Sequence, residues 1–289
     1  MQYDLTERTV AKYLAYLRER ERSEATIEKY LRSVRTFMRY LRRRPVSRAL
    51  IAQWKQTLLE QGCAPSSINA SLAALNGLFG MLGWSECRTK FLKVQRRMFR
   101  DPEKELSREE YTRLVRTAQR KNDARLALVL EAICATGIRV SEVRYLTVEA
   151  ARRGRAAICL KGKLREILLP EKLCQALLRY AAAHGIGSGE IFLSVRGGRL
   201  SRGQIWAEMK SLCADANVSA SKVFPHNLRH LFAVVFYRQC RDIARLADVL
   251  GHSSIETTRI YLLRPCREQK KQLDGLHLVL SLNAKVKVI

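Results

Sequence analysis

Apolar residues recur at intervals of three and four along the first third of the chain. This spacing is typical of helices that bury a single stripe of side chains. Gly62 and Gly83 are suited to end two of these helices, and Ser23 is a candidate N-cap for another. The four predicted helices cover residues 5–20, 26–42, 47–60 and 65–82.

The helical pattern stops between residues 88 and 104, a mostly charged segment that includes Pro102. Few apolar residues are available there for packing, and proline resists helix, so the segment predicts a linker. Ser107 then stands three residues before Glu110, which is the spacing of a capping box that opens a helix. We therefore expect a helical domain over residues 1–87, a linker over 88–104 and a second domain over 105–289.

The second domain mixes helices with two short strands. A strongly apolar helix is expected over residues 123–134, closed by Thr136-Gly137. Two strand-like runs, 156–160 and 166–169, flank the turn Lys161-Gly162-Lys163. Further helices are expected over residues 171–183, 202–214, 226–240, 243–250 and 255–262. The predicted fold is therefore mainly α with one small β-sheet (α+β), while the tail over 276–289 alternates weakly and leaves strand, helix and disorder open.

Charge narrows the class of partner. The 289 residues include 53 Lys and Arg against 27 Asp and Glu, which gives a net charge of +26. A chain this basic repels itself unless a polyanion neutralises it, so nucleic acid is the expected partner. The charge gathers at predicted helix ends and junctions, at residues 18–22, 42–44 and 96–97. No predicted helix pairs a basic face with exposed aromatic residues, so a membrane surface ranks well below DNA as the partner.

The hydropathy of the chain suggests neither export nor membrane insertion. No apolar run is as long as a bilayer crossing needs, and the start lacks the basic and apolar segments of a signal peptide. We therefore expect a soluble cytoplasmic protein that associates with the nucleoid.

Eight cysteines raise the question of disulfides or zinc. They never occur as Cys-x-x-Cys, and most have apolar neighbours, a pattern that predicts reduced, buried thiols and argues against a zinc site. The cysteines are Cys63, Cys87, Cys134, Cys159, Cys174, Cys213, Cys240 and Cys266.

Several short motifs contain residues that could bind or attack a phosphate, and each also has a structural explanation. His226 and Arg229 lie three residues apart, on one face of a predicted helix, but such pairs are common at protein surfaces. His252 follows a glycine at a predicted helix end, where a cation compensates the helix dipole. Arg139 could simply be held by the acidic residue three positions later. Tyr261 lies between an isoleucine and a leucine, which is typical of a core position.

Taken together and in order, these motifs closely resemble those of the tyrosine recombinase (phage integrase) family. They are Ala135-Thr136-Gly137-Ile138-Arg139-Val140-Ser141-Glu142, a lysine in a strand turn, His226-x-x-Arg229, Leu250-Gly251-His252, and Tyr261 nine residues after His252. Near the start, Ser23-x-x-Thr26-Ile27-x-x-Tyr30 and Ser67-Ile68-Asn69 resemble the family's amino-terminal core-binding domain. The resemblance covers essentially the whole chain.

The resemblance implies a SAM-like four-helix core-binding domain and a tyrosine recombinase catalytic domain, with a carboxy-terminal tail from about residue 265. It implies a site-specific DNA recombinase (integrase) that cleaves and rejoins strands through a covalent 3′-phosphotyrosyl bond to Tyr261. Arg139 and Arg229 would hold the phosphate, for which guanidinium forks are well shaped. His226 would assist proton transfer from the phenol and His252 would donate a hydrogen bond to the phosphate, although the two histidines could exchange these roles.

The family takes the proton for the leaving 5′-oxygen from a lysine in a β-hairpin turn. Here that turn is about one residue shorter than the family's pattern. Lys161, the first lysine after the strand, is the expected general acid, with Lys163 as the alternative, and either could be only a solvated turn cation. An arginine clamp does the electrostatic work that a metal ion does elsewhere, so neither a metal nor a cofactor is expected.

The implied partners are double-stranded DNA with specific recombination sites and further copies of this chain. Two strands are cut on each of two duplexes, so a synaptic homotetramer is implied, and the tail after Arg264 would pack on a neighbouring subunit. Candidate base contacts, any of which could equally be solvated surface, are Lys29, Arg32, Arg35, Asn69 and Asn76.

Two other functions stay open at this point. A type IB topoisomerase uses a similar residue set to relax supercoils, and a DNA-binding regulator could keep the fold without the activity. Within the family, integration, excision, inversion and resolution of chromosome dimers are all compatible with the sequence. The lack of an obvious arm-binding domain favours a simple recombinase of the Xer or mobile-element kind.

Overall fold

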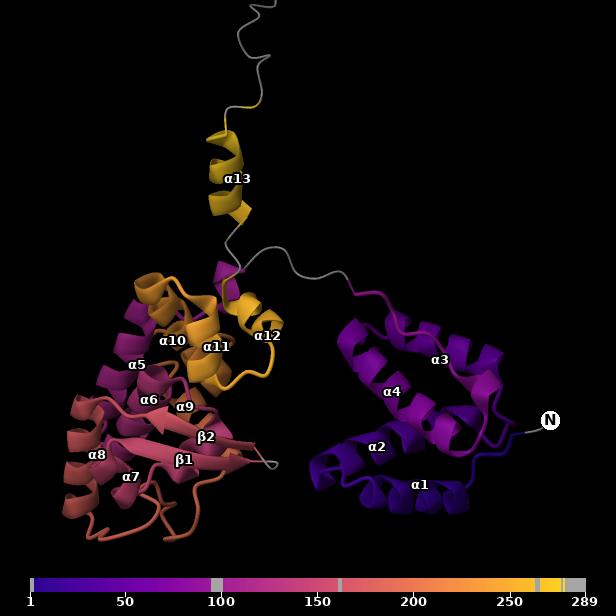
Figure 1. The fold of residues 1–289 in the computed structure, drawn as a ribbon, viewed down its shortest axis with the longest axis horizontal. Coiled ribbons are helices and arrows are strands. Elements are labelled where there is room, and N and C mark those ends of the chain that lie inside the picture. The colour runs from indigo at the N-terminus through magenta and orange to yellow at the C-terminus, as the bar shows by residue number, and fades with distance from the viewer. Residues whose placement is uncertain (1–2, 95–100, 161–162, 263–265, 277, 279–289) are drawn as a thin grey trace, which may run out of the picture. The chain divides into compact units, whose positions relative to one another are not determined.

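The computed structural model of the chain describes residues 3–94, 101–160, 163–262, 266–276 and 278. The chain divides into two compact units, Met1–Arg96 and Arg97–Ile289, and each is described by itself. Figure 1 shows the helices of the first unit and the mixed helices and strands of the second. The predicted class, mainly α with one small sheet, is confirmed.

The first unit contains the four helices that the apolar spacing predicts. Each begins and ends within a few residues of the predicted range, and a short 3-10 turn, η1 (Ser85–Cys87), follows them. Thr6 and Ser47 cap two of the helices with their side chains, whereas the hydroxyl of Ser23, at its N-cap position, pairs with that of Thr26 at 2.9 Å. The helices are α1 (Glu7–Glu19), α2 (Glu24–Leu41), α3 (Arg48–Glu60) and α4 (Pro65–Met81).

The core of this unit is built from apolar side chains that face one another across the four helices. Tyr13 of α1 is fully buried, and its hydroxyl donates a hydrogen bond of 3.0 Å to the carbonyl of Ala74 on α4. Gly77 makes room for this contact, since an added Cβ would lie 2.5 Å from the Tyr13 hydroxyl oxygen. Phe37 and Trp54 pack with their ring centroids 5.0 Å apart and join α2 to α3.

Two asparagines of α4 hold the segment that follows η1. The amide of Asn76 donates to the carbonyl of Thr89 and accepts from its N–H, at 2.9 and 3.0 Å. Asn69 makes the same pair of bonds with Leu92, at 2.9 and 2.7 Å. These two residues were candidate base contacts by sequence, but their amide groups bind the chain's own backbone instead.

The second unit is a larger helical assembly with one hairpin. Its core gathers side chains from α5, α6, α7, α8 and α9 against the inner face of the two strands. Ser107 and Glu110 form the predicted capping box at the start of α5. The elements are η2 (Pro102–Lys104), α5 (Arg108–Arg120), α6 (Ala124–Thr136), η3 (Val140–Tyr145), α7 (Val148–Arg153), β1 (Arg155–Leu160), β2 (Lys163–Leu168), α8 (Glu171–Ala183), α9 (Arg202–Ser211), α10 (Pro225–Cys240), α11 (Ile243–Leu250), α12 (Ile255–Arg259), η4 (Ile260–Leu262) and α13 (Cys266–Asp274).

The hairpin is longer than the sequence pattern predicts. β1 and β2 pair antiparallel from Arg155 opposite Leu168 to Leu160 opposite Lys163. The second strand therefore begins at residue 163 and not at 166, so the prediction that Lys163 lies in the turn is wrong. The antiparallel pairing continues to Leu160 opposite Lys163, so two residues, and not the three predicted for the turn, separate the strands. Lys161 and Gly162 lie outside the described residues.

Other elements differ from the sequence patterns in smaller ways. The helix predicted over 255–262 divides into α12 and the 3-10 turn η4, which contains Tyr261, and α9 ends at Ser211, before the predicted residue 214. The sequence patterns did not predict η3 or α7. Most of the tail over 276–289 lies outside the described residues, as do Arg96 and Arg97 of the predicted basic junction.

Of the seven cysteines whose side chains the structure describes, six are buried or half-buried, as predicted, and Cys159 is the exception. Cys159 is exposed because it lies on the outer face of β1, where alternate residues point away from the core. Among the described residues no helix is long and apolar enough to cross a bilayer.

Candidate active site

Arg229 lies at the centre of a polar cluster in the second unit. It is 2 % exposed, on the second turn of α10. Its guanidinium donates to the carbonyl of Gly137 at 2.5 Å and to that of Leu250 at 2.7 Å. Gly137 is the C-cap of α6 and Leu250 is the last residue of α11, so both carbonyls are unpaired helix ends. The negative ends of two helix dipoles therefore stabilise one buried cation.

The close packing of α10 on the end of α6 explains why residue 137 is a glycine. Gly137 has a φ of +65°, a left-handed conformation that glycine adopts without strain. A Cβ at this position would also overlap the ring of Phe232 on α10. The Thr-Gly motif thus brings the end of α6 within reach of Arg229.

His252 is held in one tautomer by two neighbours. Its Nε2 lies 2.9 Å from a nitrogen of Arg229, and its Nδ1 lies 2.8 Å from the hydroxyl of Thr258, which is fully buried. Arginine can only donate, so Nε2 accepts and the proton is on Nδ1. Burial and then the nearby arginines, Arg229 first, lower the pKa of His252 to about 4. His252 is therefore neutral near pH 7 in the free chain.

Arg139 meets the cluster from the loop after α6. Its guanidinium pairs with a carboxylate oxygen of Glu142 at 3.0 Å and reaches the carbonyl of Gly251 at 3.5 Å. Its backbone N–H donates to the other oxygen of Glu142 at 2.8 Å. Glu142 is 2 % exposed, whereas the side chain of Arg139 is 43 % exposed. The pairing with Glu142 that the sequence suggested is real, and it leaves part of the guanidinium open to solvent.

Tyr261 is the aromatic partner of the cluster. Its side chain is 3 % exposed. Burial and then Arg139 lower the pKa of Arg229 to about 10, an effect that the nearby phenol partly opposes. The ring of His252 stacks on the phenol ring with centroids 5.8 Å apart, and its Nε2 lies 2.9 Å from Arg229. The Tyr261 ring thus packs against a polar cluster and not in a purely apolar core.

Two histidines of α10 flank the same ring. The centroid of His226 lies 5.8 Å from that of Tyr261, and that of His230 lies 5.2 Å away with its ring edge-on. Burial, followed by Arg229 and Arg139, lowers the pKa of His226. His230 also faces the carboxylate of Glu105 at 3.6 Å. The structure therefore brings together five of the six predicted site residues, which are Arg139, His226, Arg229, His252 and Tyr261.

The sixth predicted residue, Lys161, lies outside the described residues, and the side chain of Lys163 does too. The structure describes the paired strands on either side of this turn, and one arginine of the second strand contacts the cluster. Arg165 of β2 donates to Glu142 at 2.5 Å and to the carbonyl of Leu250. The assignment of a lysine general acid stays a prediction.

Sequence reasoning assigned no role to Arg165, Thr258, His230 or Glu105. Arg165 could have been found, because residues 167 and 169 are buried, and a strand places residues 165, 167 and 169 on the same face. A charged residue on the inner face of a strand requires a buried partner. Glu105 carries no such signal, since its partner His230 is distant in sequence. Thr258 carries none either, because nothing in the sequence shows that it is buried beside His252, six residues before it.

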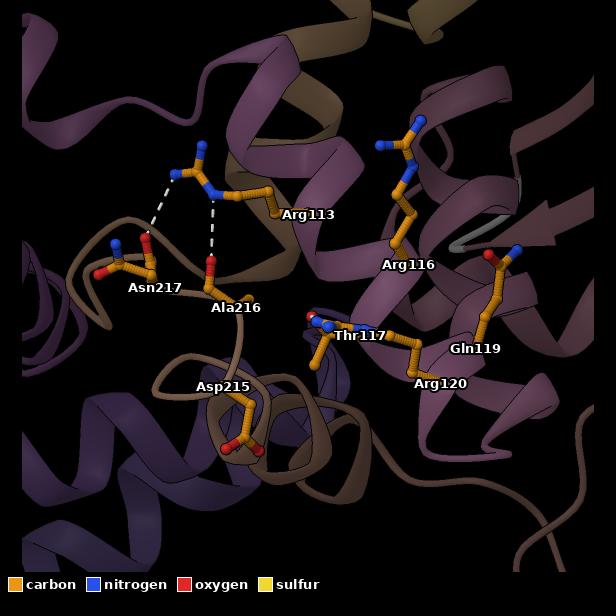
Figure 2. Close-up of a pocket in the computed structure, with 8 residues that line it drawn as sticks. All are labelled: Arg113, Arg116, Thr117, Gln119, Arg120, Asp215, Ala216 and Asn217. Atoms are coloured by element: carbon orange, nitrogen blue, oxygen red, sulfur yellow. Dashed lines mark hydrogen bonds between the residues drawn. The ribbon is translucent and has the colours of Figure 1, made fainter.

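A second basic feature of this unit lies apart from the cluster. A hollow of about 680 Å³ lies between α5 and the turn after α9 and is lined by three arginines. One of them, Arg113, donates to the carbonyls of Ala216 and Asn217 (Figure 2), at 3.1 and 3.2 Å. None of its lining residues belongs to the cluster around Tyr261. Within the described ranges, no three His, Cys, Asp or Glu side chains are grouped so that they could hold a metal ion.

Two family models match this chain. The model of the phage integrase family matches residues 104–264, and the model of the phage integrase N-terminal SAM-like domain matches residues 10–86. The chain is 31% identical over 272 residues to the tyrosine recombinase XerD of Brucella suis, covering 84% of this chain and 88% of that protein. It is 33% identical over 159 residues to XerD of Mycobacterium tuberculosis, a match to 52% of this chain and about half (51%) of that relative.

Solved structures share the fold at lower identity. A lambda integrase tetramer bound to a Holliday junction superposes with a TM-score of 0.73 and 20% identity, covering 90% of this chain and 77% of that chain. The predicted resemblance is confirmed by the matched models and by the Brucella relative. The chain therefore belongs to the phage integrase family, whose curated members similar to it are named tyrosine recombinases.

Proposed function

We propose that this chain is a site-specific DNA recombinase that cleaves and rejoins strands with Tyr261 as the nucleophile. The phenol oxygen attacks a DNA phosphorus, an O–P bond forms, and the bond to the 5′-oxygen breaks. The phenolic proton passes to a base and the 5′-oxygen takes up a proton. The observation that carries the proposal is the packing of the buried Tyr261 ring against His226 and His252, where His252 lies 2.9 Å from the guanidinium of Arg229.

Arg139 and Arg229 hold the non-bridging oxygens of the phosphate in this proposal. Arg229 stays protonated at neutral pH, and the fixed positions of the two guanidinium groups suit the negative charge that develops during attack. Arg139 supplies the open part of the site, because 43 % of its side chain is exposed while Glu142 fixes the rest. Arg229 is positioned by two helix ends before any substrate arrives.

His226 is proposed to accept the phenolic proton, and its lowered pKa keeps it in the neutral form that can do so. His252 is proposed to donate a hydrogen bond to the phosphate. In the free chain its Nε2 accepts from Arg229, so this role requires a proton on Nε2 when the phosphate binds, either taken up or moved there from Nδ1, which could then accept from the Thr258 hydroxyl. Burial and then the nearby arginines lower the pKa of His252, and a bound phosphate offsets the effect of the arginines.

Lys161 is proposed as the general acid for the leaving 5′-oxygen, with Lys163 as the alternative. A substrate with a 5′-phosphorothiolate has a leaving group that needs no proton. Each lysine is replaced by alanine, and cleavage of normal and sulfur-substituted duplexes is compared. The general acid is the residue whose variant regains cleavage on the sulfur substrate, and rescue of neither variant would contradict the assignment.

Double-stranded DNA with a specific site is the proposed substrate, acted on in the cytoplasm at the nucleoid. The first domain, assigned here to residues 1–87, presents exposed basic residues on one face of α2 that suit a phosphate backbone, followed by a linker over 88–104 and the catalytic domain over 105–289. These residues are Lys29, Arg32, Arg35 and Arg39. A synaptic tetramer, with the tail after Arg264 packed on a neighbour, is proposed because recombination cuts two strands on each of two duplexes.

The test is to trap the covalent intermediate. Genomic DNA is incubated with the protein, the covalently bound ends are sequenced, and the mapped site is rebuilt as a nicked suicide duplex. The wild-type chain is expected to form a 3′-linked complex and Tyr261→Phe to form none, while Tyr237→Phe in α10 serves as the matched control. Absence of any complex with the wild-type chain would support a DNA-binding regulator. Relaxation of supercoiled plasmids that lack the mapped site would support a topoisomerase.

A further inference from the structure

Arg165 is a buried cation that the mechanism above does not use. It lies on β2 opposite Ile158, on the inner face of the hairpin, and its side chain is 17 % exposed. Both ends of its fork have acceptors, which are a carboxylate oxygen of Glu142 at 2.5 Å and the carbonyl of Leu250. Its contacts therefore run from the hairpin to two other segments, at sequence separations of 23 and 85 residues.

Each of those two acceptors also serves a proposed phosphate-binding arginine. Glu142 binds the guanidinium of Arg139 at 3.0 Å through its other oxygen. The carbonyl of Leu250 accepts from Arg229 at 2.7 Å. Arg165 therefore shares one acceptor with each of the two arginines that are proposed to bind the phosphate. No contact among the described residues places it on the phenol of Tyr261.

The approach of Arg165 to the turn after α11 is unusually close. Gly251 has a φ of +62°, and a Cβ at this position would overlap the guanidinium of Arg165. Glycine is therefore required here both for the left-handed turn and for the room that Arg165 occupies. The next residue in the chain is His252, so Arg165 packs against the turn that sets the position of that ring.

The hairpin is also the element that carries the proposed general acid. Arg165 follows Lys161 by four residues and belongs to the strand that begins at Lys163. Figure 1 shows the two strands of this hairpin side by side within the second unit. The hairpin and the arginine pair are separate in sequence, so a contact is needed to fix one relative to the other.

We infer that Arg165 is a positioning residue that docks the β1–β2 hairpin onto Glu142 and the Leu250–His252 turn. It fixes Arg139, Arg229 and His252 relative to the hairpin without touching the phosphate. The inference rests on the proposed function for its catalytic consequence, but the docking itself is a property of the free chain.

The first test uses the protein alone. Arg165→Lys keeps the charge and loses the fork that reaches both acceptors. Amide hydrogen exchange in β2 and in residues 246–252 is expected to become on the order of tenfold faster, because both segments lose their shared tie. The matched control is Arg155→Lys in β1, whose half-exposed pair with Glu166 at 3.5 Å does not reach the cluster. Unchanged exchange in Arg165→Lys would overturn the inference.

The second test uses the mapped suicide duplex. Arg165→Lys is expected to form the covalent complex about 100-fold more slowly, since misplacing a catalytic group by 1 Å has an effect of that size. Its Kd for the duplex should stay within about threefold of wild type, because the charge is kept. Arg155→Lys should cleave at the wild-type rate. A weakened Kd with an unchanged cleavage rate would instead make Arg165 a DNA contact and overturn the inference.

The third test asks whether Arg165 acts through Glu142. If it does, the double variant Arg165→Lys with Glu142→Gln forms the complex no more slowly than the slower single variant. Multiplied defects would show that Arg165 acts independently of Glu142 and would overturn the inference. If the wild-type chain forms no complex while exchange in Arg165→Lys rises, the proposed function fails and the docking by Arg165 is supported.

Discussion

Tyr13 and Arg229 are both buried polar side chains that donate to helix carbonyls, one in each unit. Tyr13 makes a single bond to Ala74 in a core that is otherwise apolar. Arg229 binds two helix ends and His252, and Glu142 and Thr258 are buried near it. Among the described residues, the buried charged side chains all belong to the second unit. The first unit is therefore stabilised mainly by apolar packing, and the second keeps paired charges inside.

This difference teaches where a site can be recognised from physical chemistry. A buried charge is unfavourable unless it is paired and hydrogen-bonded, so a core built only for stability does without one. In the second unit Arg165 binds Glu142, and Arg165 and Arg229 share the carbonyl of Leu250. Their retention is expected where a negatively charged substrate has to be bound, as the proposed phosphate is.

The largest expected effect comes from removing the shared carboxylate. Glu142→Ala leaves Arg165 buried without its anion and is expected to reduce the free energy of unfolding of the second unit by about 3–5 kcal/mol. Glu166→Ala removes the half-exposed partner of Arg155 and is expected to cost less than about 1 kcal/mol. Hydrogen exchange of α6 peptides measures both. Equal losses would show that the buried pair is no different from the exposed one.

Arg229→Lys tests the centre of the cluster. A lysine cannot reach Gly137, Leu250 and His252 together, so covalent complex formation is expected to fall by about 10²–10³-fold. The matched change in the first unit is Arg48→Lys, an exposed residue at the start of α3, which should leave the cleavage rate unchanged. Single-turnover cleavage of the suicide duplex measures both. A wild-type rate in Arg229→Lys would remove this residue from the proposed mechanism.

The pH dependence of stability should separate the two units. The pKa of His252 is lowered to about 4 from its usual 6.5, and that of His226 is lowered too. Between pH 6.5 and about 4, His252 binds a proton in the unfolded chain but not in the folded chain. The stability that the folded chain gains from keeping this histidine neutral is therefore fully present above about pH 6.5 and is lost as the pH falls toward 4.

The first unit contains no histidine, since all five follow residue 183. Unfolding of the second unit is therefore expected to become easier between pH 7 and 5, while that of the first unit stays constant. Hydrogen exchange of peptides from each unit measures this. His252→Gln should flatten the dependence of the second unit, and a steep dependence in the first unit would contradict the comparison.

The smallest expected effect concerns the core of the first unit. Gly77→Ala places a methyl group against the hydroxyl of Tyr13 and is expected to cost about 1–3 kcal/mol. In a Tyr13→Phe background the nearest remaining atom is 3.6 Å from the new Cβ, so the same substitution should become neutral or stabilising through helix propensity. Equilibrium unfolding followed by the fluorescence of Trp54 measures the cycle. Equal costs in both backgrounds would contradict the packing described here.

Local structure was largely determined by the sequence. The apolar spacing predicted the four helices of the first unit and the start and end of α8 and α11, because one-sided burial and helix-end residues act within a few positions. The motif residues of the second unit were also predicted as a group. The resemblance of Arg139, His226, Arg229, His252 and Tyr261 to the motifs of the phage integrase family implied that they meet.

Only the tertiary structure decided how these residues are held. Arg229 binds two helix ends and His252, and Arg165 binds the carbonyl of Leu250. These hydrogen bonds join residues 21 to 92 positions apart in the sequence. The same holds for Asn69 and Asn76, whose amides bind the backbone of the segment after η1. Periodicity reports which face of an element is buried, but the partner of a buried polar group is set by which elements pack together, and that depends on the whole core.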